Sequence, residues 1–115
     1  MADRGPLSVT IREQGGAVVV TVGGEIGYHE APSLRTSIKE AYEKKPRRLV
    51  ADLSGVTYMA TPGLATLVEA LQIAKRTQTV LVLCGLTERV RAIFEIARLH
   101  TVFKIVGTVD EAVVA

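Results

Sequence analysis

The amino-acid sequence predicts a single small α/β domain built on a mixed β-sheet. Its 115 residues, 48% of them hydrophobic and 23% charged, have the size and balance of one compact globular unit. Two strand-like runs at the start, separated by a glycine pair, indicate an antiparallel hairpin. Extended and helical patterns then alternate, which is typical of parallel strands joined by helical crossovers. We therefore assign residues 1–115 to one domain.

The N-terminal hairpin is predicted from its two contrasting runs. Residues 7–12 alternate apolar and polar side chains, whereas residues 17–22 are almost wholly apolar. Glycines at 15–16 supply the turn, and glycines at 23–24 are expected to end the second strand. A helix follows over about residues 32–42 and begins with a proline, which the first turn of a helix tolerates.

The rest of the chain continues the alternation of strands and helices. The run 49–53 is nearly continuous in apolar character, as expected of a central strand covered on both faces, and Ser54-Gly55 is expected to end it. The same patterns predict two further strands and three further helices, which gives about four helices in all. The further strands are predicted over 79–84 and 102–106, and the further helices from about residue 61, from about residue 87 and over 109–114.

Charge and hydropathy restrict the partners that the chain can have. Fourteen basic and twelve acidic residues leave a formal charge of +2, too balanced for the phosphate-neutralising surface of a direct nucleic-acid binder. No apolar stretch approaches the roughly 20 residues needed to span a bilayer, so no membrane insertion is expected. The lone cysteine, Cys84, lies in an apolar run and suits a reducing compartment. We expect a cytoplasmic protein.

The residues that carry catalytic or metal chemistry are sparse and scattered. His29 and His100 have no likely metal ligand at helical spacing, and Cys84 has no cysteine partner. The glycine pairs lack the spacing and the lysine of a phosphate-binding loop, and Ser54 does not lie in a complete Gly-x-Ser-x-Gly motif. The sequence therefore predicts no catalytic residue, no metal and no cofactor, and we expect a protein that is not an enzyme.

One segment carries a functional hypothesis. In residues 56–64, Thr61 precedes Pro62, and this order predicts a threonine N-cap followed by proline at the first helical position. The run Ala51-Asp52-Leu53-Ser54-Gly55-Val56-Thr57-Tyr58-Met59, followed by a hydroxyl residue and Gly63-Leu64, resembles the STAS domain of bacterial anti-sigma factor antagonists. Gly24-Glu25-Ile26 and the segment 85–91 resemble further motifs of that family, so the similarity extends over almost the whole chain.

The resemblance implies a partner-switching function. Members of that family bind an anti-sigma factor that is also a serine/threonine kinase with a histidine-kinase-like ATPase fold, and phosphorylation at the start of the second helix turns binding off. By direct match of the motif, Thr61 is the candidate acceptor; a serine/threonine phosphatase is a further expected partner, and a homodimer stays open. The expected partner-binding surface comprises Tyr58, Met59, Ala60, Thr61, Pro62, Gly63 and Ala65.

Three positions differ from the family pattern and keep an alternative open. The family commonly has Asp before the acceptor, Ser after it and an acidic residue after its Gly-Glu-Leu turn, where this chain has Ala60, Pro62 and Gly27. The alternative is a phosphorylation-independent STAS interaction module in a signalling or lipid-transport complex, with Thr61 as a cap or a contact. Nucleotide binding is a further alternative, but the sequence contains no phosphate-binding loop that would support it.

Overall fold

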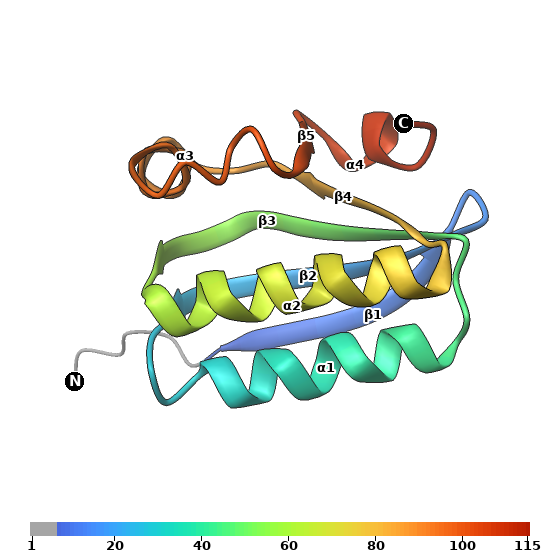
Figure 1. Cartoon of the computed structure of the whole chain (residues 1–115), viewed down its shortest axis with the longest axis horizontal. Helices are drawn as coiled ribbons and strands as arrows, with labels where there is room; N and C mark the ends of the chain where they lie inside the picture. The colour runs from blue at the N-terminus through green and yellow to red at the C-terminus, as the bar shows by residue number, and fades with distance from the viewer. Residues whose placement is uncertain (1–6) are drawn as a thin grey trace.

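The computed structural model describes residues 7–115 and has the predicted mixed sheet at its centre (Figure 1). The sheet has five strands in the order β1-β2-β3-β4-β5. The β1–β2 hairpin is antiparallel, and every later pair is parallel. The fold class inferred from sequence is thereby confirmed. The strands are β1 Ser8–Gln14, β2 Ala17–Ile26, β3 Arg48–Met59, β4 Val80–Cys84 and β5 Lys104–Val106.

The sheet separates two unequal apolar layers. Helices α1 (Ala31–Glu43) and α2 (Thr61–Thr77) lie side by side over one face, as Figure 1 shows, and their buried side chains share a core with alternate residues of β2, β3 and β4. Helix α3 (Glu88–Ile96) adds Val90 and Phe94 to this core. The short α4 (Val109–Ala112) packs with a smaller apolar cluster on the opposite face. Both clusters follow from the period-2 alternation of the strands.

Strands β2 and β3 are longer than the sequence suggested. The predictions that they end at the glycines 23–24 and at Ser54-Gly55 are wrong, because both strands continue until Ile26 pairs with Met59. A Cβ atom at Gly55 would lie 3.2 Å from the Cα of Gly23, so the two glycines let the backbones stay close where the register shifts. Here glycine accommodates an irregularity inside a ladder rather than ending the strand.

Three further boundaries differ from the predictions in the C-terminal half. The fourth strand begins at Val80 because the N–H of Thr79 donates to the Ala74 carbonyl and closes α2. The fifth strand begins only at Lys104, since the N–H groups of Val102 and Phe103 both donate to the carbonyl of Leu99 in a turn. The terminal helix is shorter than expected and covers only Val109–Ala112.

Candidate functional site

The start of α2 lies beside the loop that follows β2. Because β2 and β3 are parallel, their carboxyl ends reach the same end of the sheet, and α1 and α2 both begin there. The N–H of Ala60 donates to the carbonyl of Ile26 at 2.8 Å and so extends the ladder by one bond. The carbonyl of Ala60 accepts from the N–H groups of Gly63 at 2.9 Å and Leu64 at 3.2 Å. A single residue thus links the sheet to the helix.

The N-cap of α2 is Ala60 rather than Thr61, so the predicted capping role of Thr61 is wrong. Ala60 has φ −85° and ψ 170°, an extended conformation, and no side chain caps the helix. Its bond to Ile26 keeps this residue extended, and the helix therefore begins at Thr61 with Pro62 still inside the first turn. The side chain of Thr61 is exposed. Its hydroxyl is consequently available to another molecule instead of being used by the helix.

Two of the predicted contact residues lie beneath the surface. Gly63 is buried, and a Cβ atom there would lie 2.7 Å from Met59 Cγ and 2.8 Å from Ile26 Cγ2. Met59 is itself 1% exposed. Met59 and Gly63, both predicted as contact residues, are thus covered in the chain by itself. Their close packing sets the distance between α2 and the sheet and the direction of the helix.

An aromatic–cation pair adjoins the start of α2. Tyr58 is 37% exposed, and the guanidinium carbon of Arg89 lies 5.3 Å from the centre of its ring. The hydroxyl of Thr87 fixes this part of α3, because it donates to the Val56 carbonyl at 3.2 Å and accepts from the Val90 N–H at 3.3 Å. The sequence did not assign Arg89 to the surface around Thr61. No local pattern links it to a tyrosine of another element.

A groove of about 490 Å³ runs between α1 and α2 and reaches the start of α2. It brings Pro62 and Ala65, both predicted as contact residues, together with side chains of α1 and of the preceding loop that the sequence did not single out. Tyr28, at the mouth of the groove, is 73% exposed. The full lining is Tyr28, Ala31, Pro32, Arg35, Thr36, Lys39, Pro62, Ala65, Thr66 and Glu69.

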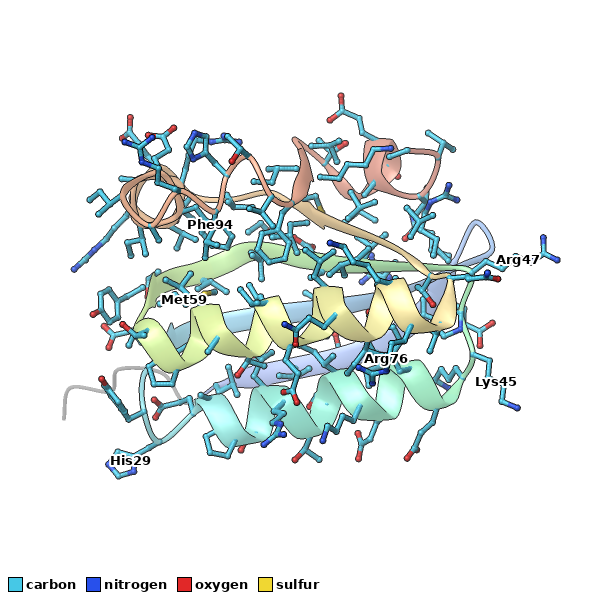
Figure 2. All side chains as sticks on the ribbon, in the orientation of Figure 1. His29, Lys45, Arg47, Met59, Arg76 and Phe94 are labelled. Carbon is cyan, nitrogen blue, oxygen red and sulfur yellow. The ribbon has the colours of Figure 1, made fainter. Side chains whose placement is uncertain are left out.

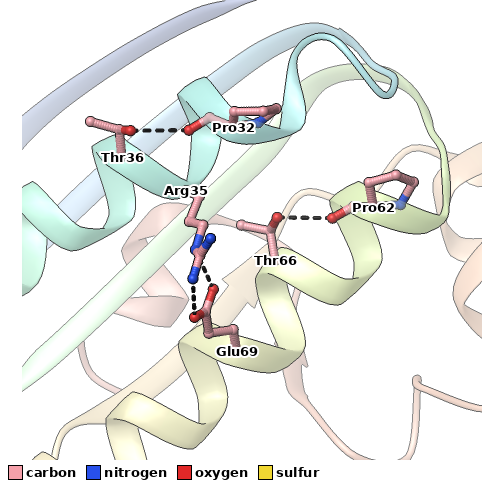
Figure 3. A network of polar contacts seen from close by, with 6 residues as sticks. All are labelled: Pro32, Arg35, Thr36, Pro62, Thr66 and Glu69. Atoms are coloured by element: carbon pink, nitrogen blue, oxygen red, sulfur yellow. Dashed lines mark hydrogen bonds and ion pairs between the residues drawn. The ribbon is translucent and has the colours of Figure 1, made fainter.

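An ion pair crosses this groove from helix to helix, as Figure 3 shows. Arg35 Nε lies 2.8 Å from Glu69 Oε1, and Arg35 Nη2 donates to Glu69 Oε2 at 2.9 Å, so the pair is bidentate. The hydrogen bond from Arg35 has the largest effect on the pKa of Glu69 and lowers it. Desolvation comes next and raises it, and the positive charges of Arg35, Lys39 and Arg76 each lower it by a smaller amount. This carboxylate therefore stays ionised among several cations.

The histidines and the cysteine of the described chain lie apart from one another and differ in burial. Residues 7–115 contain no group of three or more His, Cys, Asp or Glu side chains placed to hold a metal ion. Both His29 and His100 are exposed. Burial raises the pKa of the Cys84 thiol to about 11, with a further contribution from Asp52. Over the same residues, no helix is both long and apolar enough to cross a bilayer.

Comparisons with known proteins agree with this geometry. A family model described as STAS domain matches residues 8–112. The anti-sigma-B factor antagonist of Listeria monocytogenes is 32% identical over 100 residues, which are 86% of this chain and 88% of the relative. The crystal structure of an anti-sigma factor antagonist from Mycobacterium paratuberculosis superposes with a TM-score of 0.87 at 25% identity, covering 98% of this chain and 95% of that one.

A third comparison concerns the fold alone. The structure of the Bacillus cell fate determinant SpoIIAA in its phosphorylated form superposes with a TM-score of 0.69 at 16% identity, and it covers 92% of this chain and 96% of that chain.

Proposed function

Because the chain belongs to the STAS domain family, we propose that it is an anti-sigma factor antagonist that acts by binding through the surface around the start of α2. The observation that supports this most directly is the exposed hydroxyl of Thr61, held at a fixed helix start beside an open groove. The binding surface comprises Tyr28, Tyr58, Thr61, Pro62, Ala65 and Arg89.

The proposed partner is an anti-sigma factor that is also a serine/threonine kinase with a histidine-kinase-like ATPase fold, and Thr61 is the proposed acceptor. A phosphate there would add about two negative charges at neutral pH. The local helix offers few donors to it, since Pro62 has no N–H and the N–H of Gly63 already bonds to Ala60. The new charge would therefore face the docked partner, and phosphorylation would weaken binding without unfolding the domain. A serine/threonine phosphatase would reverse the switch.

Incubation with a kinase-type anti-sigma factor and ATP tests this function. Phosphate mapped by mass spectrometry is expected on Thr61, and Thr61→Ala should abolish its incorporation. Thr61→Glu should weaken the complex by at least about tenfold while Thr61→Ala retains it, because only the glutamate adds charge. Thr10→Glu, an equivalent change on the exposed part of β1, serves as control and should leave affinity unaltered.

Two other results would change the proposal in different ways. Equal affinity of Thr61→Ala and Thr61→Glu, with no phosphate incorporated, would favour the phosphorylation-independent interaction module. The departures at Ala60 and Pro62 from the family pattern are the features of this chain that favour that alternative. Failure of every anti-sigma factor tested to bind the unmodified chain would contradict the antagonist function itself.

A further inference from the structure

The groove between α1 and α2 is lined by two cations, Arg35 and Lys39, and by one carboxylate, Glu69, and a third cation, Arg76, lies close outside this lining. Across it, Arg35, Lys39 and Arg76 all act on the single carboxylate of Glu69. Figure 2 shows Arg76 over the space between the two helices, toward the C-terminal end of α2. Glu69 already forms a bidentate pair with Arg35. Among residues 7–115, no hydrogen bond or ion pair engages the side chains of Lys39 and Arg76.

Stability alone does not account for this arrangement. Arg35 and Lys39 are four residues apart on α1, so they are neighbours on the same helix face, where like charges are unfavourable by a few tenths of a kcal/mol. Arg76 benefits from its place in the last turn of α2, but its charge also adds to the positive potential over the groove. Glu69 and Glu43, which follows Lys39 by four residues on α1, offset two of these three cations, so the region of the groove keeps a net positive charge.

The other end of the groove is apolar. Pro32 and Pro62, together with Ala65 and the ring of Tyr28, line the part nearest Thr61. The groove is therefore graded along its length, from an apolar end that adjoins the candidate binding surface to a cationic end flanked by Lys39 and Arg76. A ligand that fills the groove must match both ends. Its apolar side chains must occupy the Thr61 end, and its carboxylates must lie at the cationic end.

We propose that this groove docks an acidic amphipathic segment of the partner protein, with apolar side chains against Tyr28, Pro62 and Ala65 and carboxylates on Lys39 and Arg76. The proposal rests on the proposed function, because the groove is continuous with the surface around Thr61. It adds the chemistry that selects the partner: carboxylates desolvated in the groove would relieve the repulsion among its cations, and a basic segment would be rejected there.

A peptide titration tests the groove without a kinase or an intact partner. The probe is a synthetic peptide of about twelve residues with leucines in its first turn and glutamates in the following turns, a length that spans a typical groove-bound helix. A second peptide has lysine in place of each glutamate. Two-dimensional ¹H–¹⁵N NMR spectra of the full chain are recorded with each peptide and, separately, with ATP.

The expected result is a set of shifts confined to the groove. The glutamate peptide should perturb the amides of Tyr28, Arg35, Lys39, Ala65 and Arg76, and the lysine peptide should not. The double variant Lys39→Gln/Arg76→Gln should bind the glutamate peptide roughly tenfold more weakly. The matched control Lys45→Gln/Arg47→Gln removes the same charge outside the groove lining, in the segment that follows the C-terminal end of α1 (Figure 2), and it should bind the peptide unchanged.

Three results would overturn the proposal. These are shifts centred on residues 45–48 instead of the groove, equal weakening by both double variants, or displacement of the glutamate peptide by ATP from the same amides, which would assign the cations to a nucleotide. The outcome is separate from that of the proposed function. An anti-sigma factor that binds wild type and Lys39→Gln/Arg76→Gln equally would refute the groove and leave the antagonist function intact.

Discussion

Gly63 packs so closely against Ile26 that a Cβ atom on Gly63 would lie 2.8 Å from Ile26 Cγ2. Gly63→Ala should therefore lower the free energy of unfolding by about 1–3 kcal/mol, even though alanine has the higher helix propensity. Urea denaturation measures this change. Gly107→Ala is the control, because a Cβ there meets only the far end of the Glu111 side chain, whose shift would weaken its bonds to the N–H groups of Gly107 and Thr108, and it should cost no more than about 1 kcal/mol. Equal stability of Gly63→Ala and wild type would contradict the packing described.

Three threonines at helix starts should respond differently to alanine. Thr87 and Thr108 are N-caps whose side chains accept from the N–H groups of Val90 and Glu111. Thr87→Ala and Thr108→Ala should each destabilise the domain by about 1 kcal/mol. Thr61→Ala should change stability by less than about 0.5 kcal/mol, because Ala60 holds the cap position. Thermal denaturation compares them, and a loss for Thr61→Ala as large as for Thr87→Ala would restore Thr61 as a cap.

The phenol of Tyr42 should make stability fall at high pH. Its hydroxyl donates to the Ala70 carbonyl at 2.7 Å, and burial raises the pKa of Tyr42 to about 12 from an ordinary value of 10.0. The folded state thus favours the protonated form, so its contribution is complete below pH 10.0 and is lost as the pH rises toward about 12. Chemical denaturation across this window should show a steeper decline for wild type than for Tyr42→Phe. Parallel curves would contradict the assignment.

The ion pair across the groove should be visible in the titration of Glu69. Its pKa in the folded protein lies below the ordinary 4.5, chiefly through the hydrogen bond from Arg35. The stabilisation that this shift reports is present above that ordinary value and is lost as the pH falls through the folded pKa. In Arg35→Gln the pKa should move back toward 4.5, as followed by ¹³C NMR of the side-chain carboxyl. Arg47→Gln, remote from the groove, should leave it unmoved.

The thiol of Cys84 should be inert in the native protein. It is buried at 0% exposure, and its pKa is raised to about 11, so little thiolate exists at neutral pH and reagents have no access to it. Labelling by iodoacetamide should occur only after unfolding by denaturant. Fast labelling of the native chain, detected by mass spectrometry, would show that strand β4 opens locally.

The order of elements was predictable because it depends on local patterns. The period-2 alternation around Val9 and the helical spacing of Leu34 and Ile38 each reflect one buried face, and the structure places all three side chains in or against the core. Strand ends were less predictable. A glycine such as Gly55 ends many strands, but here it faces Gly23 across the ladder, and only the paired strand reveals that relationship.

The candidate site was predictable only where it is local. The motif around Thr61 identified the correct helix start, although the cap residue was displaced by one position, because the ladder bond from Ala60 to Ile26 joins residues 34 positions apart. For the same reason, neither the Arg35–Glu69 pair nor the contact of Arg89 with Tyr58 could be foreseen. Each depends on which helix faces become neighbours.

The double role of Ala60 has a consequence for local motion. Its amide closes the last bond of the β2–β3 ladder, while its carbonyl receives the first bonds of α2, so the sheet and the helix meet at one residue. Exchange of the Ala60 amide with solvent should therefore be slower than that of an exposed loop amide, because it requires the end of the ladder to open. The segment that displays Thr61 is thus anchored to the sheet. A binding partner meets a preorganised epitope, which an isolated peptide of the same residues would not reproduce.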